Sequence, residues 1–335
     1  MTAAVGTLLP PRAEARVIVA RALRRNAWAI GLLILFAVLF AYTRLLRPNY
    51  GAVQFENLAI GALPVALAAI AQAIAVISGG IDLSVASVLA LTNVTAARLM
   101  DGSSEEFAVV VVVVVLLFGV LIGLVNGALV VFTRVPDIVV TLAMSFVWAG
   151  AALLVMGTPS GAAADWLKDS VDGTLLSDWV PRSLVILLAI VAIVWVPLRR
   201  TRLGLSIYAV GSNQLAAFRS GVDVGRTKIV AYALTGLFAS AGGLALTAQI
   251  GQGQPIPGPY TLLSVAAVVL GGVSLAGGRG GLAGPIIAVF VLALIRTDLT
   301  FLGVDPNLTT VIQGAIMVIV VMVGALLTMR RRERV

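Results

Sequence analysis

The sequence contains no cysteine and no histidine among its 335 residues. Disulfide bonds, thiol nucleophiles, imidazole bases and the usual zinc sites are therefore excluded. Charge is also scarce, because 11% of the residues are charged and 60% are hydrophobic. Soluble domains have about a quarter of their residues charged and about half apolar. The composition is that of an integral membrane protein.

The sequence also lacks the phosphate-binding pattern G-x-x-x-x-G-K-[ST], so we expect no ATP site in this chain. The glycine-rich run 277–281 has no Lys-Ser or Lys-Thr after it, and tight helix packing and turn formation explain it better. No cluster of titratable or nucleophilic groups falls within an apolar segment, which argues against a membrane-embedded enzyme. We expect no metal and no cofactor on the chain itself.

Ten apolar segments follow one another along the chain and predict an all-α, polytopic bundle of transmembrane helices. The third and eighth are short and rich in small and polar residues, which is typical of re-entrant or broken helices. The segments are 27–43, 57–78, 83–99, 107–132, 138–157, 183–198, 229–248, 262–277, 282–296 and 308–328.

The basic residues indicate the orientation. The net charge is +8, and most of the 23 basic residues fall in the N-terminal tail, the loop 199–228 and the C-terminal tail. Such residues collect in cytoplasmic loops, so we expect both termini inside the cell and no nucleic-acid partner. The chain is predicted to be one transmembrane domain, 1–335, with its membrane-embedded core at 26–330. The outer loop 158–182 is acidic and could form a small helix around Trp166.

The loop 199–228 is the largest cytoplasmic element. Ser212 or Asn213 suits the N-cap of a short helix, and Gly221 suits the left-handed position that ends one. Leu215 and Phe218 share a face at spacing i, i+3, which is typical of a helix that docks into a groove. Small neighbours, Ala216 and Ala217, would allow a partner to approach closely. The alternative is a helix that rests on lipid headgroups.

A second feature is the run 79–85, Gly-Gly-Ile-Asp-Leu-Ser-Val. A carboxylate at a span boundary needs donors, and Asp82 is expected to cap the helix that follows it, with a direct role in transport as the alternative. Residues 75–81 also resemble residues 267–273, which chance similarity between glycine-rich apolar runs explains equally well.

Four blocks of the sequence together resemble the permease subunit of bacterial monosaccharide ABC importers of the ribose type. They are 79–87, 126–142, 204–221 and 266–278, and they occur in the order of that family. Ala86 and Ser212 stand where the family usually has glycine, so the substrate is not transferred from a close relative. The resemblance implies a multi-pass protein of the bacterial inner membrane. It also implies a second permease subunit, a separate ATPase that carries ATP and Mg, and an extracytoplasmic solute-binding protein.

Candidate residues fall into three groups. The contact with the ATPase is assigned to Gly204, Tyr208, Gly211, Asn213, Leu215, Ala216, Ala217, Phe218 and Gly221. The structural motif comprises Gly79, Gly80, Asp82, Ser84, Gly271 and Gly272. The solute path is assigned to polar or aromatic groups within the segments, because sugars need hydrogen-bond partners and aromatic faces: Gln72, Asn93, Asn126, Trp148 and Gln313. Each of these five could equally hold helices together.

The sequence thus predicts a non-enzymatic permease that imports a monosaccharide or a similar small polar solute by alternating access. A nucleoside importer of the same family is one alternative. An ion-coupled secondary carrier is another, although such carriers place ionisable groups at mid-membrane, and here the acids lie at boundaries and in loops.

Overall fold

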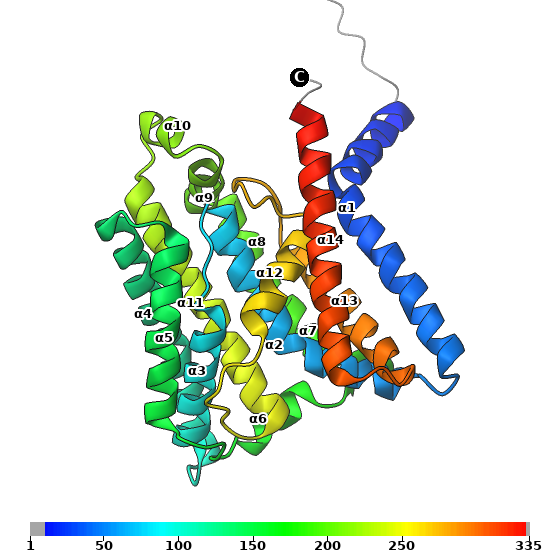
Figure 1. Cartoon of the computed structure of the whole chain (residues 1–335), viewed down its shortest axis with the longest axis vertical. Coiled ribbons are helices and arrows are strands. Elements are labelled where there is room, and N and C mark those ends of the chain that lie inside the picture. The colour runs from blue at the N-terminus through cyan, green and yellow to red at the C-terminus, as the bar shows by residue number, and fades with distance from the viewer. Residues whose placement is uncertain (1–10, 333–335) are drawn as a thin grey trace, which may run out of the picture.

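The computed structural model describes residues 11–332, which form a bundle of α-helices (Figure 1). Its elements, in chain order, are α1 (Pro11–Leu46), α2 (Ala52–Ile77), α3 (Val85–Met100), α4 (Glu105–Thr133), α5 (Asp137–Val155), α6 (Asp165–Val171), β1 (Thr174–Leu175), β2 (Ser177–Pro181), α7 (Arg182–Ile190), the π-helical turn η1 (Val191–Trp195), α8 (Val196–Arg200), α9 (Arg202–Ser212), α10 (Gln214–Arg219), α11 (Val224–Ile250), α12 (Tyr260–Leu270), α13 (Ala283–Phe301) and α14 (Pro306–Arg332).

The all-α membrane bundle predicted from the sequence is confirmed. Among the described residues, seven helices are long and apolar enough to cross a membrane, counting α7, η1 and α8 as one continuous helix. The predicted segments three and eight correspond to α3, with 16 residues, and α12, with 11. At about 1.5 Å per residue, α12 is roughly 17 Å long and cannot cross about 30 Å of hydrocarbon alone. The number of crossings stays a prediction.

The outer loop contains the small helix predicted around Trp166, which is α6. It also contains one feature that the sequence analysis did not predict, an antiparallel hairpin of β1 and β2. The loop predicted at 199–228 is shorter than expected, because α8 extends to Arg200 and α11 begins at Val224. Lys228 therefore belongs to a helix and not to the loop.

The centre of the bundle is α2, which is buried over most of its length and packs against α11, α12 and α13. Its many alanines let neighbouring backbones approach closely, as in other membrane bundles. A second tight contact joins α4 to α11, where Gly119, Gly123 and Gly127 repeat every four residues along α4 and face the backbone of α11. Exposed apolar side chains lie mainly on α1, α4 and α5, which is the surface expected to face lipid.

The two ends of the bundle differ. Figure 1 shows α9 and α10 at one end, together with the start of α1 and the end of α14, whereas α6 lies at the other end. We refer to these as the α10 end and the α6 end. The sequence predicts that the α10 end faces the cytoplasm, because the basic loop and both basic tails would lie there.

Candidate functional site

The loop between α8 and α11 presents a short helix, α10. The side chain of Asn213 accepts a hydrogen bond from the backbone N–H of Ala216 at 2.9 Å and caps the helix. Gly221 follows the helix with a φ of +83°, in the left-handed region. Leu215 and Phe218 are 59% and 67% exposed. The structure thus forms the capped helix with two exposed apolar side chains that the sequence predicts.

Four residues that the sequence analysis assigned to partner contact point into this chain instead. Ala217 is only 5% exposed, so it packs against the loop and contributes little to the outer face of α10. Gly204 and Gly211 are buried, and a Cβ at either would overlap the backbone of α8 or α2. Tyr208 donates a hydrogen bond to the carbonyl of Gly280 at 2.9 Å, and burial raises the pKa of its phenol. These residues fix the position of the loop.

A junction of glycines joins α9 to the ends of α2 and α12. A Cβ at Gly211 would overlap the carbonyl oxygen of Ile77, the last residue of α2. The same oxygen accepts a hydrogen bond from the N–H of Gly278 at 2.9 Å. Gly277 and Gly79 lie on the other sides of Gly211. We call Ile77, Gly79, Gly211, Gly277 and Gly278 the glycine junction. Because no side chain separates these backbones, α9 is in direct backbone contact with both neighbouring segments.

The helices α2 and α12 end in the same way. After each helix, three successive residues, 78–80 or 271–273, donate backbone hydrogen bonds to carbonyls that lie four, three and five residues earlier, respectively. The middle residue of the three is a glycine with a positive φ, +86° at Gly79 and +77° at Gly272. Equivalent positions are therefore 193 residues apart. The sequence resemblance matched residues 75–81 with 267–273, which is wrong by one residue. The shared geometry makes α12 a structural counterpart of the end of α2.

After α2, residues 80–84 run without helical structure to the start of α3. Such backbone is stable inside a membrane bundle only if its polar groups find partners. Thr141 accepts a hydrogen bond from the N–H of Leu83 and donates one to the carbonyl of Ile81, both at 3.0 Å. The carboxylate of Asp82 accepts hydrogen bonds from the backbone N–H and the hydroxyl of Ser84. Asp82 therefore fixes Ser84, the N-cap residue of α3, and makes no hydrogen bond to the first turn of the helix itself.

Two of the predicted solute-path residues extend this network. The amide of Asn126 donates to the hydroxyl of Ser84 at 2.8 Å, and the indole N–H of Trp148 donates to the carbonyl oxygen of Asn126 at 3.1 Å. A third, Asn93, binds Thr247 and the backbone of residues 252 and 254. The hydrogen bonds of Asn93, Asn126 and Trp148 thus connect α3 with α4, α5 and α11 and serve packing.

The other two predicted path residues differ from these three. Gln313 is half-buried on α14 and takes no part in this network. Gln72 is 0% exposed on α2, and neither its amide nitrogen nor its oxygen has a hydrogen-bond partner among the described residues. An unpaired carboxamide in an apolar core costs roughly 1–3 kcal/mol, so its presence calls for a functional explanation.

An ion pair that the sequence analysis missed lies beside Gly80. The ammonium of Lys228 is 2.9 Å from the carboxylate of Asp137, and both side chains are largely buried. The hydroxyl of Tyr232 donates to the same carboxylate at 2.9 Å. A Cβ at Gly80 would overlap this carboxylate. The group therefore clamps the start of α5 to α11, directly against the non-helical segment.

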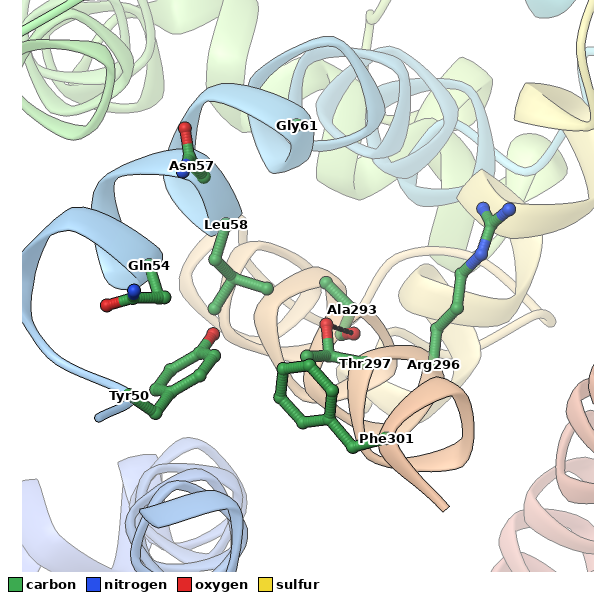
Figure 2. Close-up of a pocket in the computed structure, with 9 residues that line it drawn as sticks. All are labelled: Tyr50, Gln54, Asn57, Leu58, Gly61, Ala293, Arg296, Thr297 and Phe301. Atoms are coloured by element: carbon green, nitrogen blue, oxygen red, sulfur yellow. Dashed lines mark hydrogen bonds between the residues drawn. The ribbon is translucent and has the colours of Figure 1, made fainter. Parts of the chain in front are cut away.

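A pocket with several polar groups opens between α2 and α13 (Figure 2). Its volume is about 390 Å³, and Figure 2 shows Tyr50, Gln54 and Asn57 on one side and Arg296, Thr297 and Phe301 on the other. Leu58, Gly61 and Ala293 complete the lining. The side-chain oxygen of Gln54 accepts a hydrogen bond from the backbone N–H of Gly51 at 2.8 Å.

A second pocket of about 490 Å³ shares Asn57 with the first and reaches Gln249, Gly251, Lys168 and Asp172. Gly61 lies close to Gln249, because a Cβ at Gly61 would be 3.8 Å from the amide nitrogen of Gln249. Carboxamides, hydroxyls, aromatic rings and the charged groups of Arg296, Lys168 and Asp172 line the two pockets, and such groups bind hydroxylated solutes. Gln54 and Asn57, three residues apart near the start of α2, were the signal in the sequence that could have indicated this pocket.

Residues 54–321 match the family described as branched-chain amino acid transport system, permease component. The chain belongs to this permease family. The match begins at the pocket and continues through the glycine junction to α14. Membership makes the chain a transporter subunit of the bacterial inner membrane, in agreement with the apolar helices.

Individual relatives agree with the resemblance to ribose-type permeases. The chain is 33% identical over 302 residues to the ribose import permease protein RbsC of Escherichia coli K12, covering 87% of this chain and 92% of the relative. It is 34% identical over 261 residues to RbsC of Bacillus subtilis, covering 76% and 80%. It is 29% identical over 325 residues to the autoinducer 2 import system permease protein LsrD of Yersinia enterocolitica, covering 92% and 94%. No solved structure matches the chain significantly.

Proposed function

We propose that this chain forms the membrane pathway of an ABC importer for a monosaccharide or a similar small, hydroxylated solute. The pocket between α2 and α13 carries the proposal, because it combines carboxamides, a hydroxyl and the guanidinium of Arg296 with aromatic rings. The names of the relatives, which include ribose permeases, support the same class of solute. The chain moves the solute and makes or breaks no covalent bond.

The energy source in this proposal is a separate ATPase subunit. The chain has no phosphate-binding loop, so ATP and Mg bind to the partner. The exposed side chains of Leu215 and Phe218 on α10 are the anchors for that partner. A solute-binding protein delivers the solute to the α6 end, and a second permease subunit completes the pathway. Movement of α10 reaches the pathway through α9 and the glycine junction.

The solute class is tested by uptake in bacterial cells that lack their own ribose permease. Cells that express this chain with an ATPase and a binding protein of the ribose type are expected to take up labelled ribose, and unlabelled pentoses should compete. Control cells contain the same ATPase and binding protein but lack this chain, and ribose should enter them only at the background rate. Competition by leucine or by a nucleoside, with none by pentoses, would instead indicate an amino-acid or nucleoside permease.

A further inference from the structure

One face of α2 carries a line of neutral carboxamides and a glycine. Gln54 and Gln72 are 18 residues apart, which is about five helical turns, so they point in the same direction. Gly61 lies about 20° from that direction, and Asn57 is its neighbour one turn away. We call Gln54, Asn57, Gly61 and Gln72 the α2 stripe. The stripe has no ionisable group.

The helices that pack around α2 show what surrounds this stripe: α11 lies on one side of it and α13 on the other. Pro64, Leu67 and Ala71 contact α11, as shown by Gly242 against Pro64 and Leu67 and by the hydrogen bond from Thr235 to the carbonyl of Ala71 at 3.3 Å. Leu58, on the opposite side of the stripe, faces α13 across the pocket. The remaining helix that packs against both α2 and α13 is α12.

The two halves of the stripe have different environments. Near the α6 end, Gln54, Asn57 and Gly61 are exposed in the pockets. Gln72 lies about 16 Å further towards the α10 end and is completely buried, with both polar atoms unpaired. The helix α12 packs against α2 and, with only 11 residues, is too short to cover the whole stripe. The loop that follows α12 is held to α9 by the glycine junction and by the bond from Tyr208 to Gly280.

We propose that Gln72 is a second solute-binding position, closed off by α12 and uncovered when the ATPase moves α9. This inference rests on the proposed function and adds to it a defined second station on the pathway. The carboxamide offers two donors and one acceptor. A neutral, hydroxylated solute supplies the partners that Gln72 lacks in the closed state. A charged solute would be buried there without a counter-ion, at a large cost in desolvation. The stripe therefore selects uncharged polyhydroxylated solutes.

Single cysteines test this proposal without interference, because the chain has no native cysteine. The variants Asn57→Cys, Gln72→Cys and Ile74→Cys are compared in the importer assembled with its ATPase and binding protein in membranes. The probe is a membrane-impermeant methanethiosulfonate. Ile74 is also 0% exposed but lies about 200° from Gln72 around the helix, so it is the matched buried control.

We expect Asn57→Cys to react at rest, and Ile74→Cys to stay unreactive throughout. Gln72→Cys should be unreactive at rest and at least tenfold faster to react when ATP and ribose-loaded binding protein drive turnover. Excess ribose should slow that reaction. If Gln72→Cys stays unreactive while the same membranes transport ribose, the proposal is wrong and the proposed function stands. If wild-type membranes transport no solute of this class, the proposed function itself fails.

Replacement of Gln72 by leucine separates a solute contact from a structural role. Since no hydrogen bond is lost, Gln72→Leu should unfold at the same temperature as the wild type or higher. We expect ribose uptake to fall at least tenfold, while stimulation of the ATPase by loaded binding protein is retained. Ser183→Ala is the matched control, because it removes another buried and unpaired polar group on α7, and it should transport normally. Normal uptake by Gln72→Leu would overturn the proposal.

Discussion

Replacing Phe218 with aspartate is expected to detach the ATPase from this permease and to abolish solute uptake. Phe218 is 67% exposed at the end of a capped helix, and with Leu215 it forms the only i, i+3 apolar pair on α10. Loss of an aromatic anchor from a helix-in-groove contact costs about 2 kcal/mol or more, which corresponds to roughly 30-fold in affinity. The measurement is recovery of the ATPase on purification of a tagged permease, together with ribose uptake.

The control for Phe218→Asp is Leu176→Asp, which places the same charge on a fully exposed residue in the hairpin at the α6 end. That variant should retain the ATPase. Ala217→Glu would be a poor test, because Ala217 is buried and the change would distort the loop itself. If Phe218→Asp retains the ATPase and transports ribose, α10 rests on lipid headgroups instead and the coupling assignment is wrong.

Substitution of Gly211 by alanine should separate ATPase binding from transport. The added methyl group overlaps the carbonyl oxygen of Ile77, so the end of α9 must move away from α2. Overpacking of this kind typically costs 1–3 kcal/mol. The outer face of α10 is unchanged, so we expect normal recovery of the ATPase, at least a tenfold fall in uptake and an increased ratio of ATP hydrolysed to solute imported.

Gly150→Ala is the matched control, because no atom lies within 4 Å of a Cβ at that position in α5. Alanine favours helix over glycine by about 1 kcal/mol, so this variant should be equally or more stable and fully active. Normal coupling in Gly211→Ala would show that the glycine junction transmits no movement. Loss of the ATPase from Gly211→Ala would mean that the junction positions α10, so that this variant cannot separate ATPase binding from transport.

Local signals in the sequence predicted much of this structure. Asn213 and Gly221 define α10 because capping and a left-handed stop depend on neighbouring residues only. Segments three and eight are short and rich in small and polar residues, and these features correctly predicted short helices. The start of α2 was placed five residues late, at 57 instead of 52, because Gln54 and Glu56 interrupt the apolar run near the start of the helix. The hairpin at 174–181 was missed because its two strands are very short.

The candidate site was harder to predict because its parts meet only in three dimensions. Asp137 and Lys228 are 91 residues apart in the sequence and meet only where the first residue of α5 approaches α11. The partner-contact assignment of Gly204 and Gly211 followed the order of residues in the loop, whereas burial decides which side of α9 faces outward. The pocket combines the first turns of α2 with the last turns of α13, which no periodicity within one segment connects.

The most direct test of the central claim is ATP-driven accumulation of solute in proteoliposomes. The permease, the ATPase and the binding protein are combined, and each is omitted in turn. We predict that labelled ribose accumulates only when all three proteins and Mg-ATP are present, and that the permease alone hydrolyses no ATP. Accumulation by the permease alone in response to an ion or proton gradient would contradict this account and identify a secondary carrier.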